Sequence, residues 1–360
     1  MSEPREFEAW LRLGLVPGLG PVGQRRLLDQ FGHPESVVAA SSQQLEHVVG
    51  RKTAAAIVAG PDAERLKAAQ DWLLQPGNRL LTLADSDYPA WLLQTIDPPP
   101  LLYLKGDHSL LSGDSLAIVG SRNATPQGAA NAEAFACELS DAGLHVVSGL
   151  ALGIDAAAHR GGLAGASSSI AVVGTGLDIV YPARNRDLAH ALAERGLLIS
   201  EFPLGTKAIA SNFPRRNRLI SGLALGVLVI EAALQSGSLI TARFALEQGR
   251  DVFALPGSIH SPLSKGCHLL IKQGAKLVES ASDVLEELRG VQNGRASNPV
   301  LETPHDQNPL LSNMGFDPVD LDTLCSRSGL TADGASAMLL QLELDGVVAR
   351  LPGGRFQRLR

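Results

Sequence analysis

Between residues 100 and 288 the chain repeats one pattern, a short apolar run followed by a longer stretch with apolar residues at helical spacing. The apolar runs are nearly unbroken and rich in Val, Ile and Leu, which is typical of strands covered on both faces. They are "LAIVG" (116–120), "HVVSG" (145–149), "IAVVG" (170–174), "LLISE" (197–201), "VLVIE" (227–231) and "DVFAL" (251–255). This alternation predicts an α/β fold with a doubly wound, mostly parallel sheet.

The helical stretches carry their own start and stop signals. They are "TPQGAANAEAFACELSDAG" (125–143), "NRDLAHALAERG" (185–196) and "SLITARFALEQG" (238–249). Thr125 followed by Pro126 is a favourable pair for the first positions of a helix. A glycine closes each stretch, where helices commonly end.

Residues 1–75 lack such strands and are predicted to be helical. They contain G-x-G-x-x-G at Gly18, Gly20 and Gly23, the spacing of a dinucleotide-binding loop. That loop requires a preceding strand, and neither Pro17 nor the residues upstream of it fit one. The run instead indicates a helix-hairpin-helix, whose turn amides often contact a nucleic-acid backbone. A small packing domain is the alternative.

The C-terminal part differs in composition. Residues 289–306 are polar without a period and predict a linker. Residues 307–360 then give helix, turn, helix and two short strands, the pattern of a winged helix. Its second helix, 332–346, has no Arg or Lys, which argues against reading of the DNA major groove and leaves protein docking open. The wing arginines that remain available for a DNA backbone are Arg350, Arg355, Arg358 and Arg360.

Length and charge restrict this picture. A chain of 360 residues is too long for one ordinary domain, so two or three are expected. The formal net charge is −6, so no global basic field gathers nucleic acid. Any site for an anion must therefore be local.

Cysteine usage and the apolar runs point to a cytoplasmic protein. Cys137, Cys267 and Cys325 lie far apart, which fits a reducing compartment and offers no thiolate metal site. The first ten residues are not those of a signal peptide. The longest apolar run, 222–234, contains Glu231 and is too short to span a bilayer.

Each predicted strand ends in small or hydroxyl residues. In an open parallel sheet, ligands bind beyond the carboxyl ends of the strands. The segments there are "GSRNAT" (120–125), "SGLALGID" (148–155), "GTGLD" (174–178), "EFPLG" (201–205), "EAALQSGSL" (231–239) and "LPGSIHSPLSKG" (255–266). Backbone amides and hydroxyls at helix starts bind anions, so this edge predicts a site for a phosphate-bearing ligand.

A basic cluster falls on the same edge. The stretch "NFPRRNRLI" (212–220) follows the fourth strand of the pattern, and its arginines are expected to project onto the cradle. The residues involved are Arg122, Lys207, Arg215, Arg216 and Arg218. Clustered arginines beside amide donors suit phosphate, and solvated surface ion pairs are the alternative. Phe202 and Phe213 lie nearby and could stack a base, or belong to the core.

Catalytic signals are weak. The sequence has no G-x-S-x-G, G-x-x-x-x-G-K-[ST] or H-E-x-x-H motif, and its histidines lack metal-ligand spacing. Asp155 and His159 stand four residues apart and could form a hydrogen bond on a helix. A structural role is expected for Asp155 and its loop. The loop residues in question are Ser148, Gly149, Gly153 and Asp155.

Taken together, the ordered motifs resemble the DNA-processing protein A family (DprA, also called Smf). The resemblance runs through "IVGSR", "VVSGLALGIDAAAHRGGL", "AVVGTGLDIVYPARNRDL", "ISEFPLGTKAIASNFPRRNRLISGLA", "VIEAALQSGSLITARFALEQGRDVFALPGSI" and "GCHLLIKQGAKLV". It covers about half the chain in register, and the flanking regions agree. It implies a SAM-like helical domain (1–75), an extended Rossmann-like domain (76–288), a linker (289–306) and a winged helix (307–360).

The resemblance also implies a function. Family members bind incoming single-stranded DNA and load RecA recombinase onto it during natural transformation. They displace single-strand binding protein, act as homodimers, and need no nucleotide cofactor or metal. The expected role is therefore that of a mediator and not of an enzyme.

Carried over residue by residue, the single-stranded DNA site falls on one set of positions. They are Ser121, Arg122, Gly174, Thr175, Gly176, Leu177, Asp178, Lys207, Phe213, Arg215, Arg216, Asn217 and Arg218. The dimer contact of the family implies the apolar residues of "CHLLIKQGAKL", with Leu269, Leu270 and Ile271 at its centre.

Two rival functions stay open. The Rossmann-like part also resembles the lysine-decarboxylase-like nucleotide hydrolases. Those enzymes carry P-G-G-x-G-T-x-x-E at a strand end, and the corresponding residues 234–247 lack the paired glycines and the spaced Glu. A duplex-DNA regulator acting through the winged helix is the second rival, and the second helix without Arg or Lys argues against it.

Overall fold

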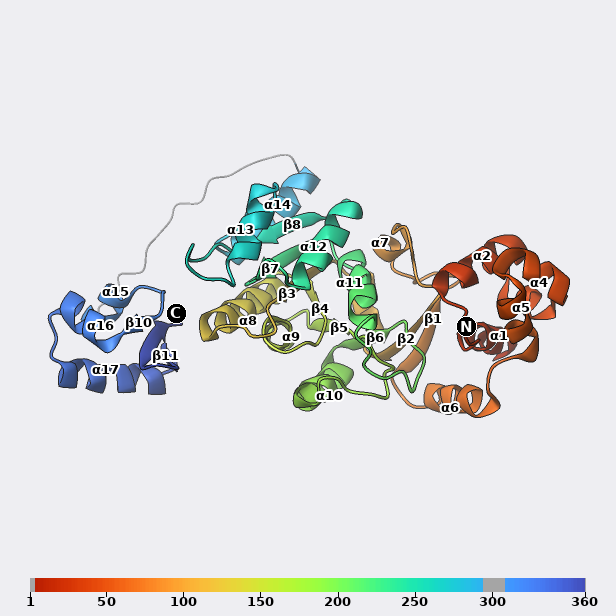
Figure 1. Cartoon of the computed structure of the whole chain (residues 1–360), viewed down its shortest axis with the longest axis horizontal. Coiled ribbons are helices and arrows are strands. Elements are labelled where there is room, and N and C mark those ends of the chain that lie inside the picture. The colour runs from red at the N-terminus through yellow and green to blue at the C-terminus, as the bar shows by residue number, and fades with distance from the viewer. Residues whose placement is uncertain (1–3, 294–307, 360) are drawn as a thin grey trace.

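The computed structural model describes residues 4–293 and 308–359 (Figure 1). The chain begins with six helices, which lie at one end of the molecule. They are α1 (Pro4–Gly14), α2 (Pro21–Phe31), α3 (Pro34–Ala39), α4 (Ser42–Val49), α5 (Arg51–Ala59) and α6 (Ala63–Leu73). The G-x-G-x-x-G segment joins α1 to α2, with Gly18 at φ +80°, so a helix and not a strand precedes it. Its rejection as a dinucleotide-binding loop is confirmed.

A nine-stranded sheet forms the centre of the molecule. Its strands are β1 (Asn78–Thr82), β2 (Leu101–Gly106), β3 (Ser115–Gly120), β4 (His145–Ser148), β5 (Ser169–Val172), β6 (Leu197–Ser200), β7 (Gly226–Ile230), β8 (Asp251–Ala254) and β9 (Lys276–Leu277). The order is β1-β2-β6-β5-β4-β3-β7-β8-β9. From β6 to β9 all pairs are parallel, as the apolar runs predicted. β1 and β2 extend the sheet in antiparallel pairing, which the sequence pattern did not predict.

Helices cover both faces of this sheet, because alternate residues of each strand enter opposite cores. Leu116 and Ile118 of β3 pack with Phe135, whereas Ala117 and Val119 pack with Leu219. The helices are α7 (Ala90–Leu93), α8 (Pro126–Asp141), α9 (Ile154–Ala164), α10 (Arg186–Arg195), α11 (Asn212–Gly222), α12 (Ser238–Glu247), α13 (Lys265–Lys272) and α14 (Ala281–Asn293). Short 3₁₀ turns lie at His108–Ser112 and Ala183–Asn185.

The chain reverses its direction of travel across the sheet at β3. From β3 it moves outward through β4 and β5 to β6, and it then returns to place β7 on the other side of β3. The crevice between the ends of β3 and β7 is therefore the topological switch point, where ligands commonly bind in open α/β sheets.

The last part of the chain is a winged helix, as predicted. It consists of α15 (Pro309–Met314), β10 (Val319–Asp320), α16 (Leu321–Ser328), α17 (Ala332–Leu344), β11 (Val348–Leu351) and β12 (Arg355–Arg358). It lies at the opposite end from α1–α6 (Figure 1) and contacts α8, where Gln127 Nε2 donates to the Leu359 carbonyl at 2.9 Å. α14 continues to Asn293, so the start of the predicted linker is helical, and residues 294–306 lie outside the described part.

Within residues 4–293 and 308–359, every helix is too short or too polar to cross a lipid bilayer.

Candidate nucleic-acid interface

Two exposed cations, an exposed tyrosine and a half-buried phenylalanine lie at the carboxyl edge of the sheet. Arg122 lies two residues beyond β3, and its guanidinium carbon is 5.5 Å from the centre of the Phe213 ring. The Phe213 and Tyr181 rings have centroids 5.5 Å apart and planes inclined by 35°. Lys207 follows β6 and is also exposed. We call Arg122, Tyr181, Lys207 and Phe213 the basic aromatic surface.

Tyr181 was missed as a site residue in the sequence. It is 47% exposed, although it follows the "GTGLD" segment by only three positions. Its contact with Phe213 joins the loop after β5 to the start of α11. No sequence spacing links positions 181 and 213, so only the fold brings the two rings together.

The loop after β5 holds this surface in place. Asp178 accepts hydrogen bonds from the Gly205 amide at 2.9 Å through both carboxylate oxygens, and the Gly176 amide donates to the Thr206 carbonyl at 3.0 Å. These contacts tie the loop to the segment that carries Lys207. Gly174 accepts from Asn212 Nδ2 at 3.1 Å, and a side chain at position 174 would meet the Phe213 ring.

Two residues of that loop face the interior. Thr175 is buried and its Oγ1 donates to the Ile179 carbonyl at 2.8 Å, while Leu177 packs in a hydrophobic core. The predicted contact of these two residues with DNA can therefore involve their backbone amides but not their side chains. Their buried side chains anchor the loop, so that Gly176 and Asp178 can contact the segment of Gly205 and Thr206.

Arg216 is also inside the protein, contrary to the expectation that it projects onto the cradle. Its side chain is buried, and Nη1 donates to the carbonyls of Gly149 and Val172. Burial lowers the pKa of Arg216 to about 10, and the nearby Asp155 carboxylate opposes that shift. The guanidinium thus fixes the ends of β4 and β5 from within.

Arg218 is similarly engaged, so its predicted exposure is wrong as well. Its Nη2 lies 2.6 Å from Glu201 Oε2, and its Nη1 donates to the Asp97 carbonyl at 2.5 Å. Glu201 is almost completely buried, and burial raises its pKa while Arg218 and Arg215 oppose the shift. The surroundings of α11 explain the outcome, because the helix is buried on all sides from Arg218 to Gly222, and Arg218 is enclosed although it lies about 200° around the helix from Arg216.

The other two polar site residues predicted in α11, Arg215 and Asn217, lie nearer the surface. Arg215 is 40% exposed at its side chain, pairs with Glu201 at 3.0 Å and lies over the Phe202 ring at 5.1 Å. Asn217 donates to the Gly237 carbonyl at 3.3 Å. Arg215 therefore stays available at the edge of the site, whereas Phe202 is a buried core residue.

The loop after β4 packs under Arg122. Ser148 Oγ donates to the Ile118 carbonyl at 2.6 Å, and Asp155 accepts from the Ala151 amide at 3.3 Å. Gly153 has φ +75° and packs against the Ser121 carbonyl, where a side chain has no space. Gly149 similarly lies against the Arg216 guanidinium. Ser121 itself is buried, and its Oγ accepts from the Asn123 amide at 3.1 Å.

His159 is a buried residue whose partners the sequence did not identify. Its Nε2 accepts from the Leu150 amide at 3.2 Å, and Nδ1 lies 2.8 Å from Ser169 Oγ. Asp155 makes its own contact with Ala151 instead of pairing with His159. Burial lowers the pKa of His159 to about 3, so the ring is neutral at physiological pH.

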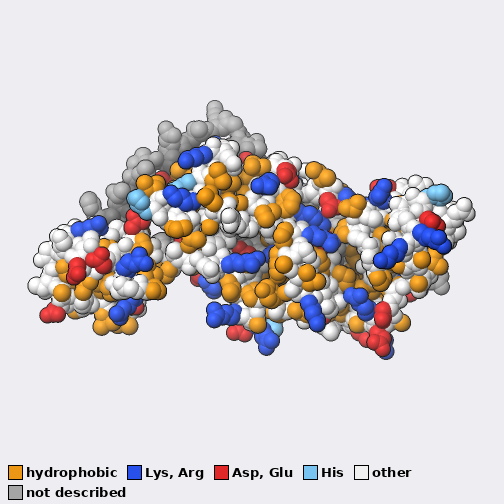
Figure 2. Space-filling view, viewed as in Figure 1, with side chains coloured by type: hydrophobic (Ala, Val, Ile, Leu, Met, Phe, Trp, Pro, Cys, Tyr) orange, Lys and Arg blue, Asp and Glu red, His pale blue; other side chains and the backbone are white. Residues whose placement is uncertain are grey.

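The predicted dimer residues divide between surface and core. Leu269 is 37% exposed, Ile271 is half-buried, and Leu270 is only 5% exposed within the core of the sheet. Leu270 therefore cannot form a surface contact. Leu234 and Leu246 are exposed and line a shallow depression together with Leu269. Hydrophobic side chains gather over this part of the molecule, around α12 (Figure 2).

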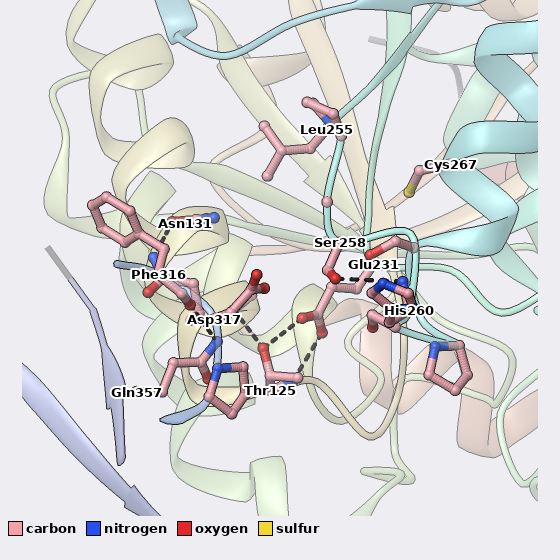
Figure 3. A pocket seen from close by; sticks show the side chains of 18 of the residues that line it. Thr125, Asn131, Glu231, Leu255, Ser258, His260, Cys267, Phe316, Asp317 and Gln357 are labelled. Atoms are coloured by element: carbon pink, nitrogen blue, oxygen red, sulfur yellow. Dashed lines mark hydrogen bonds between the residues drawn. The ribbon is translucent and has the colours of Figure 1, made fainter. Parts of the chain in front are cut away.

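The other half of the edge, between β3 and β7, has a different character. Glu231 follows β7, and its carboxylate accepts from the Thr125 amide at 2.8 Å and from Thr125 Oγ1 at 2.5 Å (Figure 3). Thr125 is the N-cap of α8. A carboxylate of the protein itself thus takes the position at this helix start where a ligand phosphate would be expected.

Among the described residues, no three His, Cys, Asp or Glu side chains gather in a way that could hold a metal ion. The three cysteines are free thiols.

A family model for DNA recombination-mediator protein A matches residues 79–289. The chain belongs to this family. A model of the DprA winged helix domain matches residues 295–354. Protein Smf of Escherichia coli is 40% identical over 364 residues, which cover 99% of this chain and 96% of that protein. DNA processing protein DprA of Streptococcus pneumoniae is 48% identical over 206 residues, covering 57% of this chain and 73% of the relative.

Two solved structures of the family are similar to this one. The X-ray structure of DprA from Streptococcus pneumoniae aligns with a TM-score of 0.68 at 38% identity and covers 80% of this chain and 99% of that chain. DNA processing protein A from Helicobacter pylori aligns with a TM-score of 0.54 at 31% identity. The alignment covers 59% of this chain and 97% of the Helicobacter chain. The Helicobacter structure concerns the single-stranded DNA binding mode of that protein.

Proposed function

We propose that this chain binds single-stranded DNA on the basic aromatic surface and loads RecA recombinase onto it during natural transformation. The observation that carries the proposal is the meeting of Arg122, Tyr181 and Phe213 at the carboxyl edge of the sheet, with ring and cation separations of 5.5 Å. Family membership and the Helicobacter relative supply the ligand class.

The chemistry of the surface suits a flexible strand. Arg122 and Lys207 are exposed cations that can pair with phosphates, and the Tyr181 and Phe213 rings offer faces on which unpaired bases can stack. Stacking on aromatic rings is available to every base, so we expect affinity with little sequence preference. A rigid duplex keeps its bases inside and gains only the phosphate contacts.

The net charge of −6 affects how the site works. Because the whole molecule does not attract DNA, binding depends on a few local cations and must weaken as salt increases. Arg216 and Arg218 are buried and already donate to carbonyls and to Glu201, so the proposal assigns them to the fold.

We further propose that the protein acts as a homodimer through the exposed leucines of α12, α13 and the preceding loop. Leu234, Leu246 and Leu269 lie around one depression, which Arg243 also lines. Dimerisation would bring two DNA sites onto one strand and raise the effective concentration of the second site. A Leu269→Glu substitution should shift the protein towards monomer in analytical ultracentrifugation. A distribution identical to that of the wild type would reject this surface.

Nucleotide hydrolysis is not favoured. The position where a nucleotide phosphate would be expected at α8 holds the Glu231 carboxylate. The stretch 234–247 also lacks the paired glycines and the properly spaced Glu of the hydrolases.

The first test is a titration of a fluorescent single-stranded oligonucleotide across a salt series, with duplex DNA and nucleoside monophosphates as competitors. We expect tight binding that resists duplex competitor and weakens with salt, with a log–log slope of about −0.7 per phosphate contact. Binding only to duplex, or only to nucleotides, would refute the proposed site.

RecA loading is measured separately, as RecA filament formation on single-stranded DNA coated with single-strand binding protein. Addition of this protein should shorten the lag before filaments form. DNA binding without any change in the lag would retain the DNA site and reject the loading function.

A further inference from the structure

A narrow crevice lies between the N-terminal helices and the loop that follows β6, and we call it the interdomain crevice. Its volume is about 180 Å³, below the range of cavities that enclose small organic ligands. The glycine-rich turn between α1 and α2 forms one wall with Gly20 and Pro21, and Phe202 and Pro203 form part of the other. The space therefore suits one charged group of a larger ligand.

Two guanidinium groups, one from each domain, line the interdomain crevice. Arg215 belongs to α11 and is 40% exposed at its side chain. Arg65 belongs to the first turn of α6 and is exposed. Among the described residues, none of the ion pairs includes Arg65. Both arginines therefore have N–H donors available to a ligand.

The Arg65 side chain is directed towards the crevice. Burial raises the pKa of Tyr103, and the Arg65 cation opposes that shift, so the guanidinium lies near the Tyr103 side chain. Tyr103 is itself part of the crevice lining. The Trp72 ring packs edge-on against Tyr103, with centroids 5.9 Å apart, and holds α6 against β2. Arg65 is thus placed at the crevice before any ligand binds.

The charges in the interdomain crevice favour a phosphate. Among the described residues that line it, Glu201 carries the only carboxylate, and its side chain is 1% exposed. That carboxylate already pairs with Arg215 at 3.0 Å and with Arg218 at 2.6 Å. Two arginines beside a neutralised acid suit a phosphate.

A wider depression next to the crevice has the opposite character. It shares Leu15 and Arg65 with the crevice. Its lining includes three acids, Glu64, Asp71 and Asp178. These carboxylates disfavour a phosphate in the wider part, because like charges repel. The position for a phosphate is therefore the narrow part, between Arg65 and Arg215.

The segment 202–207 connects the interdomain crevice to the basic aromatic surface. Phe202 and Pro203 line the crevice, and Lys207 belongs to the surface. The four residues from Pro203 to Lys207 span at most about 14 Å. A strand bound to the basic aromatic surface therefore needs only a short extension to place a further phosphate at the crevice.

We infer that single-stranded DNA continues from the basic aromatic surface to the interdomain crevice, where Arg65 and Arg215 hold one phosphate between the sheet and the N-terminal helices. The N-terminal domain thereby becomes part of the DNA interface. This inference rests on the proposed DNA site. That site can exist without the additional contact, so the two claims can fail separately.

The test measures the affinity of the full chain for two oligothymidylates by fluorescence anisotropy across a salt series. The short one has about six nucleotides and covers the basic aromatic surface alone, and the long one has about twenty and reaches the crevice. Arg65→Met removes the cation at similar size, and Arg65→Lys keeps the charge. Lys67→Met is the matched control, because it removes an exposed cation from the same helix outside the crevice lining.

We expect Arg65→Met to bind the long oligonucleotide about two- to tenfold more weakly, as for one lost contact, and to flatten its log–log salt slope by about 0.7. It should bind the short oligonucleotide like the wild type. Arg65→Lys and Lys67→Met should keep the wild-type slope with the long one. Melting temperatures of the variants verify that each is folded.

Three results would overturn the inference and retain the DNA site: an unchanged slope in Arg65→Met, equal flattening in Lys67→Met, or equal weakening for both oligonucleotides. Failure of the wild type to bind either oligonucleotide would refute the DNA site, and the inference with it.

Discussion

Arg122 and Arg216 belong to the same edge of the sheet, and they differ in what surrounds them. Arg122 is exposed above the Phe213 ring, whereas Arg216 is buried and donates to the carbonyls of Gly149 and Val172. Both matched a phosphate-binding cluster in the sequence. The comparison shows that arginines predicted to form one basic cluster indicate a binding site only after the burial of each side chain is known.

The two environments predict different consequences of mutation. A buried guanidinium has lost its water, so its stabilisation depends on the carbonyls and on Asp155 around it. An exposed guanidinium contributes little to folding and keeps its donors for a ligand. Stability and DNA affinity should therefore separate between the two arginines.

The largest effect is expected for Arg216→Met. It leaves two buried carbonyls and the Asp155 carboxylate without their cation, and should lower the free energy of unfolding by about 3–5 kcal/mol. Arg215→Met is the matched control one residue away, and it should change that free energy by less than about 1 kcal/mol because Arg215 is 40% exposed. Urea denaturation followed by circular dichroism measures both. Similar losses of unfolding free energy in the two variants would show that Arg216 is no more important for folding than Arg215.

The next largest effect is expected for the Phe213 ring and the affinity for single-stranded DNA. Phe213→Leu keeps an apolar side chain but removes the stacking face, and should weaken single-stranded DNA binding by about 1–3 kcal/mol. Phe316→Leu, which changes an exposed ring on the winged helix, should leave the affinity unchanged. Fluorescence anisotropy at one salt concentration suffices. Equal affinities for wild type and Phe213→Leu would place the bases elsewhere.

A third prediction concerns the buried His159 and the pH dependence of the free energy of unfolding. The folded-state pKa of His159 is lowered to about 3, and that of an unfolded histidine is near 6.5. Between these values the unfolded chain binds more protons, so stability is complete above about pH 6.5 and falls as pH decreases, by up to about 1.4 kcal/mol per pH unit.

Unfolding free energies at pH 7, 6 and 5 should therefore decrease less steeply in His159→Gln than in the wild type. His190→Gln, which removes an exposed histidine, is the control and should keep the wild-type slope. Parallel pH curves for wild type and His159→Gln would mean that this histidine does not contribute to acid sensitivity.

The smallest effect is expected for Arg122→Ala. One lost phosphate contact should flatten the log–log salt dependence of single-stranded DNA binding by about 0.7, with unfolding unchanged. Arg160→Ala is a suitable control, because Arg160 is an exposed arginine that pairs with Glu133 at 3.1 Å. An unchanged slope in Arg122→Ala would move the phosphate contacts away from this residue.

The sequence predicted the parallel part of the sheet and the winged helix because both depend on local patterns. Unbroken runs such as 116–120 and 227–231 have few alternatives to a strand covered on both faces. The antiparallel strands β1 and β2 escaped prediction, because 78–82 and 101–106 lie outside the regular strand–helix alternation. Their pairing with each other and with β6 is a tertiary property.

The features of the site also separate into those that local sequence patterns predict and those that depend on the tertiary structure. By itself the sequence determined that small residues, hydroxyls and arginines follow the strands, since strand ends can be recognised from local patterns. Only the tertiary structure decided that Arg216 and Arg218 turn inward, that Tyr181 meets Phe213, and that Glu231 fills the start of α8. The physical reason is that burial and pairing depend on residues distant in the chain, which only the fold brings together.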